Sequence, residues 1–283
     1  MTTLTAPPET SGTDQTAPDR PAYRVTGRRV LASEWAKLWS LRSTWITLGL
    51  GLLFLVAFGI IAASHYKSNL HSGRHMDRDF ATATAVSLSL FGTNFAQLAL
   101  GVLGVLVTAG EYSTGMIRST LAAVPRRLPV LWSKATVYGL VALVIATVGA
   151  LVAFLVGSQI VSGTPAAMGL GHAGVVRSLL GAGLYLGLVG VIGAALGALL
   201  RSVAGGISVL VAALMLVPGL ISLLPTSWQG NIEPYLPSHA GESIFALTQD
   251  PTSLSPGAGL LVFLGWTALA LVGAAYRLVR SDV

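Results

Sequence analysis

The side chains that could carry out acid–base, nucleophilic or metal chemistry are few in this sequence of 283 residues. It contains 17 Lys and Arg, 11 Asp and Glu, five His and no Cys. The lack of cysteine excludes disulfides, thiolate zinc sites, Fe–S clusters and cysteine nucleophiles. His71 and His75 could bind a metal if they shared a helix, but Gly73 lies between them and no ligand set of fixed geometry is evident. We therefore predict a solvated loop there, with no metal, no cofactor and no catalytic residue.

The chain is too apolar to be a soluble domain. Charged residues make up 10% of it and apolar residues 53%, whereas ordinary soluble domains have about 25% charged residues. Six segments have the roughly 20 mostly apolar residues that a spanning helix needs. They are residues 45–64, 86–109, 136–161, 178–200, 203–224 and 257–276, and none contains Asp, Glu, Lys, Arg or His. The sequence predicts an all-α polytopic membrane protein with six transmembrane helices.

The basic residues predict how the chain is oriented. Lys67, Arg74, Arg78 and Arg177 lie in loops on one side, and all five histidines lie on that side too. The other 13 lie on the opposite side: Arg20, Arg24, Arg28, Arg29, Lys37, Arg42, Arg118, Arg126, Arg127, Lys134, Arg201, Arg277 and Arg280. The positive-inside rule then places both termini in the cytoplasm of a plasma-membrane protein. Orientation in the lipid bilayer accounts for the net charge of +6, so we predict no nucleic-acid partner.

Two regions precede the first span. Residues 1–22 are rich in Thr, Pro, Ser and Asp, which predicts a disordered cytoplasmic tail ahead of a transmembrane domain over residues 23–283. Residues 30–41 predict an interfacial helix along the membrane surface, with one apolar face and one polar face. The apolar face holds Leu31, Trp35, Leu38 and Trp39, and the polar face holds Ser33, Lys37 and Ser40. This helix either anchors the first span only or also contacts a cytoplasmic partner.

The cytoplasmic loop over residues 110–135 is predicted to contain a short helix from Thr114 to Val124. Ile117, Leu121 and Val124 fall on one face of it, with Arg118 on the flank. Pro125 ends the helix, and Arg126 and Arg127 follow. A surface helix with a basic turn is suited to docking a partner protein. The alternative is a loop whose arginines only satisfy the positive-inside bias.

Some features inside the spans bear on packing. Asn94 and Gln97 lie three apart in the second span, where polar side chains either tie helices together or line a translocation route. Small residues in the fourth span, among them Gly183, Gly187 and Gly190, form a seam for close helix packing, within the chain or between subunits. Pro218 predicts a kink or break in the fifth span. The outer loop over residues 225–256 is long enough to contain short helices that re-enter the membrane or lie at its outer surface.

The loop between spans two and three resembles the signature region of ABC-2-type transporter permeases. The resemblance is carried by Glu111, Tyr112, Gly115, Arg118, Leu121, Pro125, Arg127 and Lys134. Residues 33–38 and 42–45 resemble the approach to the first span in actinobacterial members of this family. Six spans and a long final outer loop match its architecture, which is that of a type V exporter-like permease. The resemblance covers residues from about Leu31 onwards.

The resemblance implies a division of labour between subunits. Such permeases pair as homo- or heterodimers and are driven by separate cytoplasmic ATP-binding subunits, into which the loop between spans two and three inserts a coupling helix. On that basis we expect the ATPase-coupling residues to include Glu111, Arg118, Leu121, Pro125, Arg126 and Arg127, with Ile117 as a further packing contact. The chain has no G-x-x-x-x-G-K-[ST] motif, since none of its three lysines follows a glycine. We thus expect a permease subunit, an exporter without its own ATPase activity.

Three other functions compete with this interpretation. An integral-membrane enzyme is disfavoured because no H-E-x-x-H motif, cysteine or intramembrane ionisable group is present. A secondary transporter would ordinarily use intramembrane acids or show an internal repeat. A stand-alone membrane scaffold would not need a structured loop between spans two and three. The sequence does not identify the transported substrate, because a route through apolar spans has no recognisable code.

Overall fold

The computed structural model describes residues 26–73, 80, 82–124, 127–249 and 252–280, and these residues form helices and connecting turns without a strand. The predicted tail over residues 1–22 lies outside this range, as do His75, Pro125 and Arg126. Six helical segments are long and apolar enough to cross a membrane: Arg42–Ser72, Ala85–Ser113, Arg127–Ile160, Val175–Leu200, Val203–Ile221 and Pro256–Arg280. The prediction of an all-α chain with six potential spans is confirmed. Such apolar runs are expected to form helices, because in lipid every backbone N–H and C=O group must find its hydrogen-bond partner within the segment.

The six spans are built from more than six elements. The single-helix spans are α2 (Arg42–Ser72), α7 (Arg127–Ile160), α8 (Val175–Leu200) and α13 (Pro256–Arg280). The second span combines α4 (Ala85–Ser89), the 3₁₀ turn η1 (Leu90–Gly92) and α5 (Thr93–Ser113). The fifth combines α9 (Val203–Val211), the π-helical segment η2 (Ala212–Leu216) and α10 (Val217–Ile221). Several of these helices extend past the apolar segments, so their end turns carry charged side chains.

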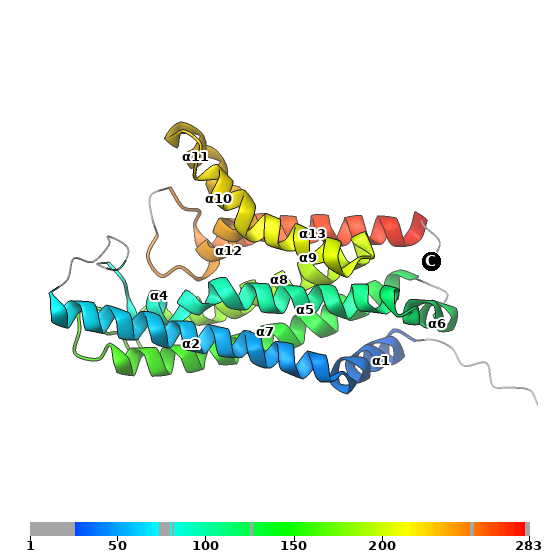
Figure 1. Ribbon diagram of the computed structural model, residues 1–283, viewed down its shortest axis with the longest axis horizontal. Helices are drawn as coiled ribbons and strands as arrows, with labels where there is room; N and C mark the ends of the chain where they lie inside the picture. The colour runs from blue at the N-terminus through cyan, green and yellow to red at the C-terminus, as the bar shows by residue number, and fades with distance from the viewer. Residues whose placement is uncertain (1–25, 74–79, 81, 125–126, 250–251, 281–283) are drawn as a thin grey trace, which may run out of the picture.

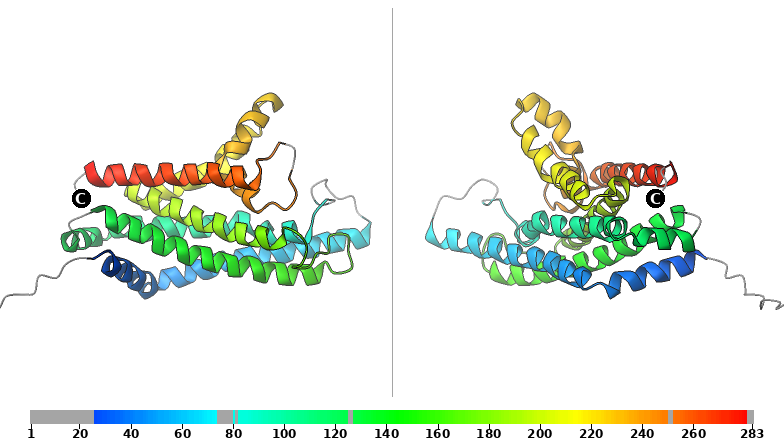
Figure 2. Two further views of the ribbon diagram at one scale, coloured as in Figure 1. Left: turned by 180° about the vertical axis from the view of Figure 1, so that it is seen from behind. Right: turned by 45° about the vertical axis from the view of Figure 1, so that its right-hand side comes forward.

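The helices form an elongated bundle around α8, which packs against α5, α7, α9, α12 and α13. Two short helices lie at one end of the bundle, α1 (Gly27–Ser40) and α6 (Met116–Ala123), together with the C-terminal end of α13 (Figure 1). Both views in Figure 2 keep α1 and α6 at this same end. We call it the α1–α6 end of the bundle. α10 and α11 (Thr226–Ile232) project away from the other helices.

The small residues of α8 allow close packing within the chain. A Cβ atom at Gly183 would lie 1.9 Å from Thr147 Oγ1 of α7, and one at Gly187 would lie 2.9 Å from Leu143 Cβ. Gly190 lies against the ring of Tyr138 in the same way, and further along α8 a Cβ at Gly193 would lie 2.1 Å from the Gly101 carbonyl oxygen of α5. The seam therefore serves intrachain packing, the first of the two roles that the sequence leaves open.

The two polar residues of the second span have different surroundings. Gln97 is buried and accepts a hydrogen bond at Oε1 from the Tyr185 hydroxyl of α8. Asn94 is exposed, and its amide contacts only the Phe91 carbonyl oxygen, at 3.5 Å, among the residues the structure describes. Gln97 thus ties α5 to α8, while Asn94 takes no part in that packing.

The fifth span is interrupted and the outer loop contains short helices, as the sequence predicts. The expected disruption near Pro218 is the π-helical segment η2, and π-turns of this kind interrupt regular α-helices. The outer loop contains α11, the 3₁₀ turn η3 (Glu233–Tyr235) and α12 (Pro237–Phe245). α12 packs on α8 and α13, and Arg177 of α8 donates hydrogen bonds to the carbonyl oxygens of Ile244 and Ala246, at 3.0 and 2.6 Å. A cation at this position satisfies carbonyl groups that the end of α12 leaves unpaired.

Candidate functional site

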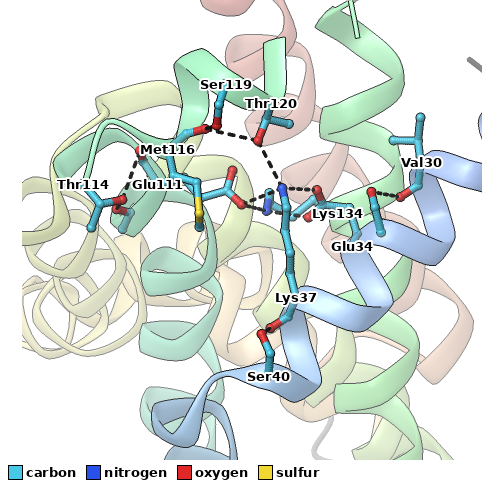
Figure 3. A network of polar contacts seen from close by, with 12 residues as sticks. Val30, Glu34, Lys37, Ser40, Glu111, Thr114, Met116, Ser119, Thr120 and Lys134 are labelled. Atoms are coloured by element: carbon cyan, nitrogen blue, oxygen red, sulfur yellow. Dashed lines mark hydrogen bonds and ion pairs between the residues drawn. The ribbon is translucent and has the colours of Figure 1, made fainter. Parts of the chain in front are cut away.

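Four charged side chains from three helices meet at the α1–α6 end of the bundle (Figure 3). α1 contributes Glu34 and Lys37, α5 contributes Glu111, and α7 contributes Lys134. Lys134 Nζ lies 2.6 Å from Glu34 Oε2 and 2.9 Å from Glu111 Oε1. Lys37 Nζ lies 2.9 Å from Glu34 Oε1 and 3.2 Å from Glu111 Oε1. Each lysine therefore pairs with both carboxylates, and we call these four residues the charge network.

Most of the charge network is removed from solvent. Glu34 is 3% exposed, Glu111 6% and Lys134 3%, while Lys37 is partly exposed. Burying a charge costs several kcal/mol unless it is paired and hydrogen-bonded. Two carboxylates and two ammonium groups balance each other here, and each ammonium group bridges two carboxylates. Removal of one of the four groups would leave a buried charge without its full complement of partners.

Local sequence explains how α1 presents an acid to the interior. Val30, Glu34 and Leu38 recur every four residues and form the buried face of α1, which packs on α7. Leu31 and Trp35 are exposed, and Lys37 points into the charge network. The predicted division of α1 is therefore only partly right. Leu38 is buried as an apolar-face residue should be, but the inner face is centred on Glu34.

Burial and the two carboxylates shift the pKa of Lys37 in opposite directions. Burial lowers its pKa, whereas the hydrogen bond from Lys37 to Glu34 and the charges of Glu34 and Glu111 raise it. The net result is a pKa above the ordinary value of 10.5. Lys37 is consequently charged throughout the neutral range, with the carboxylates stabilising its protonated form.

The short helix α6 is connected to the charge network by a hydrogen bond. Gly115 precedes it with a φ of 74°, a left-handed conformation that glycine adopts without strain. Lys37 Nζ lies 3.2 Å from Thr120 Oγ1 on α6, so one lysine joins α1, α5 and α6. Ile117 is buried on the inner side of α6, while Arg118 and Ser119 are exposed. α6 lies within the predicted limits of residues 114–124 and presents one open side.

The expected coupling residues separate into inner and outer positions. Glu111 is buried in the charge network, where it pairs with Lys134 and Lys37. Leu121 is half-buried and Arg118 is exposed. Arg127 is the first residue of α7 and donates a hydrogen bond to the Leu278 carbonyl oxygen of α13 at 3.1 Å. Pro125 and Arg126 lie outside the described residues. The loop itself is shorter than residues 110–135, because α5 continues to Ser113 and α7 begins at Arg127.

Sequence reasoning assigned no role to Glu34 or to the contacts of Arg201. Glu34 had a recognisable signal, since it is the one acid within residues 26–73 and lies four residues from both Val30 and Leu38. Arg201, at the turn between α8 and α9, places its guanidinium carbon 5.3 Å from the centre of the Tyr112 ring. Arg201 Nη2 also donates a long hydrogen bond to the Arg277 carbonyl oxygen of α13, at 3.5 Å. No local pattern predicts these contacts, because they depend on the packing of distant helix ends.

One carboxylate oxygen of the charge network accepts no hydrogen bond from the described residues. Glu111 Oε2 is buried, and no described residue hydrogen-bonds to it. Such an acceptor is costly to bury. It would be stabilised by any rearrangement of α1, α6 or α7 that supplied a further donor. Within the described residues no group of three or more His, Asp or Glu side chains could hold a metal ion.

No protein-family model matches the sequence, and no curated protein matches it. The likeness to ABC-2-type permeases therefore remains the resemblance of particular residues.

Proposed function

We propose that this chain is the membrane-spanning permease subunit of an ABC transporter, an exporter driven by a separate cytoplasmic ATP-binding subunit. The observation that supports the proposal is the connection of α6 to the charge network through Lys37 and Thr120. Through that connection, a displacement of α6 reaches the ends of α1, α5 and α7 together. A motor protein in the cytoplasm needs such a structural connection to move spans that lie in the membrane.

The open side of α6 suits contact with a partner. Met116 is 42% exposed, and Arg118 and Ser119 beside it are exposed as well. Exposed methionine and arginine side chains suit a protein interface, because the cores of interfaces are enriched in both residue types. In this proposal Arg118 and Leu121 contact the motor directly. Glu111 acts from inside, as the residue that passes the displacement from α6 to α5.

A shift between two states requires a difference in contact energy between them. The unused Glu111 Oε2 offers such a difference, since a second state that gave it a donor would gain a hydrogen bond. The permease is proposed to work as a dimer, with a second copy or a related chain, and both termini face the cytoplasm.

The test is co-purification with a candidate ATP-binding subunit, followed by measurement of ATP hydrolysis and substrate export in proteoliposomes. Arg118→Glu combined with Leu121→Asp is expected to abolish assembly with the motor. Arg280→Glu is the matched control, because it reverses an exposed arginine at the same end of the bundle but on α13, and it should leave assembly intact. Intact assembly and transport in the α6 variant would contradict the coupling role.

The same preparation separates the competing functions. Export that requires the motor and ATP supports a permease. Transport by the chain alone, driven by a proton or sodium gradient, would identify a secondary transporter. Stable folding with neither transport nor a motor partner would identify a scaffold.

A further inference from the structure

Exposed tryptophans mark the level of the membrane surface at the α1–α6 end. Trp35 of α1 is 50% exposed, Trp45 of α2 is 56% exposed and Trp132 of α7 is 50% exposed. Trp35 follows Glu34 and Trp132 precedes Lys134 by two residues, so the Glu34–Lys134 ion pair brings these two tryptophans near one level. Trp45 lies close to Trp35, because the ring of Trp39 contacts both of them. Tryptophan is enriched at the level of the lipid headgroups in membrane proteins. The corner between α1 and α2 is therefore placed among headgroups.

Three tryptophan rings in edge-on and tilted contact make this corner a continuous apolar surface. Trp39 lies between its two neighbours, with ring centroids 5.4 Å from Trp35 and 4.4 Å from Trp45. The Trp45 indole N–H donates a hydrogen bond to the Trp39 carbonyl oxygen at 3.3 Å. These contacts fix the direction in which α1 leaves α2. The exposed edges of Trp35 and Trp45 then face the surrounding lipid from a fixed position.

Two arginines flank this aromatic surface. Arg28 lies seven residues before Trp35 and Arg42 three residues before Trp45, so each shares a helix side with its tryptophan. Both arginines are exposed, and neither guanidinium group has a hydrogen-bond or ion-pair partner in the part of the chain that the structure describes. Glu34 is the one acid between residues 26 and 73, and it is buried. Within residues 26–73 the outer side of the corner is thus positively charged, with no exposed acid beside it.

We propose that the outer face of α1 and its corner with α2 form a binding site for anionic phospholipid. Arg28 and Arg42 contact the phosphate groups, and Trp35 and Trp45 pack on the glycerol and upper acyl region. Basic residues beside a transmembrane helix attract anionic lipids electrostatically. Lipid bound here holds α1 against the bundle, and α1 in turn supplies Glu34 and Lys37 to the charge network. The proposal is independent of whether the chain belongs to a transporter.

The experiment measures lipid binding to the purified full-length chain in detergent, by native mass spectrometry and by thermal unfolding. Phosphatidylglycerol is titrated against phosphatidylcholine. An arginine that contacts the lipid phosphate contributes a factor of about 5 to affinity, so Arg28→Gln with Arg42→Gln should weaken phosphatidylglycerol binding about 25-fold. The double variant should also lose the rise in unfolding temperature that phosphatidylglycerol gives the wild type. Both side chains are exposed, so the variant should fold normally.

The matched control is Arg277→Gln with Arg280→Gln, which removes the same charge from the same end of the bundle at α13. It should bind phosphatidylglycerol like the wild type. An equal loss in this control would show attraction by overall charge and overturn the site. Binding of phosphatidylcholine as tight as that of phosphatidylglycerol would overturn it too, as would unchanged binding by the Arg28/Arg42 variant. Inorganic phosphate at matched concentration should give no stabilisation, and full stabilisation by phosphate would show a site for free anions.

Discussion

Lys134 Nζ lies 2.6 Å from Glu34 Oε2, although the two residues are 100 positions apart in the chain. This ion pair joins α7 to α1, and it is buried on both sides. It fixes a non-spanning helix to the end of the third span, beside the helix that we propose as the contact with a motor. The charge network is therefore a structural link between α1, α5 and α7 at this end of the bundle.

Removing one member of the charge network should be strongly destabilising. Lys134→Met leaves two buried carboxylates with only Lys37 to compensate them. Loss of one partner from a buried ion pair costs about 3–5 kcal/mol. Thermal unfolding in detergent checks this, with Lys67→Met near the opposite end of α2 as the control. Combining Lys134→Met with Glu34→Gln should cost less than the sum of the single changes, because the double variant leaves Lys37 and Glu111 as a balanced pair. Strict additivity would contradict the coupling.

Enlarging the glycine at the α5–α8 crossing should separate the two helices. A Cβ atom at Gly193 would lie 2.1 Å from the Gly101 carbonyl oxygen, so the backbones must move apart in Gly193→Ala. We expect a destabilisation of about 1–3 kcal/mol, as for other overpacked interiors. Gly265→Ala in α13 is the control, since nothing lies within 4 Å of a Cβ there. That change should be neutral or slightly stabilising, because alanine has the higher helix propensity. Both can be compared by unfolding temperature.

Gln97 and Asn94 should respond differently to loss of their amide groups. Gln97→Leu removes the hydrogen bond with Tyr185 and leaves a buried hydroxyl without its acceptor. Interhelical hydrogen bonds in membranes contribute about 0.6–2 kcal/mol, so a loss of that size is expected. Asn94→Leu should have almost no effect on stability, because Asn94 is exposed. Equal losses in the two variants, measured by unfolding under the same conditions, would contradict the assignment of Gln97 as the tie.

The stabilisation by Lys37 should persist through neutral and mildly alkaline pH. Its pKa is raised above 10.5 by the hydrogen bond to Glu34 and by both carboxylates, against the effect of burial. A group with a raised folded-state pKa stabilises fully below its unfolded pKa and loses that effect as the pH rises through the folded value. The difference in unfolding free energy between wild type and Lys37→Met should thus be constant from about pH 8 to 10 and shrink above that. A difference that already fell by pH 9 would show that Lys37 is not held in its charged form.

The orientation can be measured with single cysteines, since the natural chain has none. Ser119→Cys on α6 and Ser72→Cys at the end of α2 both replace exposed side chains on opposite ends of the bundle. A membrane-impermeant maleimide added to intact cells should label Ser72→Cys only. After the membrane is opened it should label both. Labelling of Ser119→Cys in intact cells would reverse the predicted topology.

Several features of the fold follow from the sequence because they are local. A run of about 20 apolar residues must form a helix in lipid, whatever lies beside it. The disruption near Pro218 and the short helix after Gly115 are also local features, so they could be predicted from nearby residues. The glycine seam of α8 could be recognised too, although only the structure shows that it meets α5 and α7.

The site depended on contacts that no local pattern contains. Asn94 and Gln97 are one helical turn apart, yet one is exposed and the other buried, because only Gln97 faces α8. The sequence alone determined six spans and the segregation of charge to the helix ends, since burying a side chain in lipid is decided by its own polarity. The tertiary structure decided that Glu34 meets Lys134 and that Lys37 reaches Thr120. Which charged side chains form ion pairs depends on which helix faces pack together. Shape complementarity over the whole bundle determines that packing.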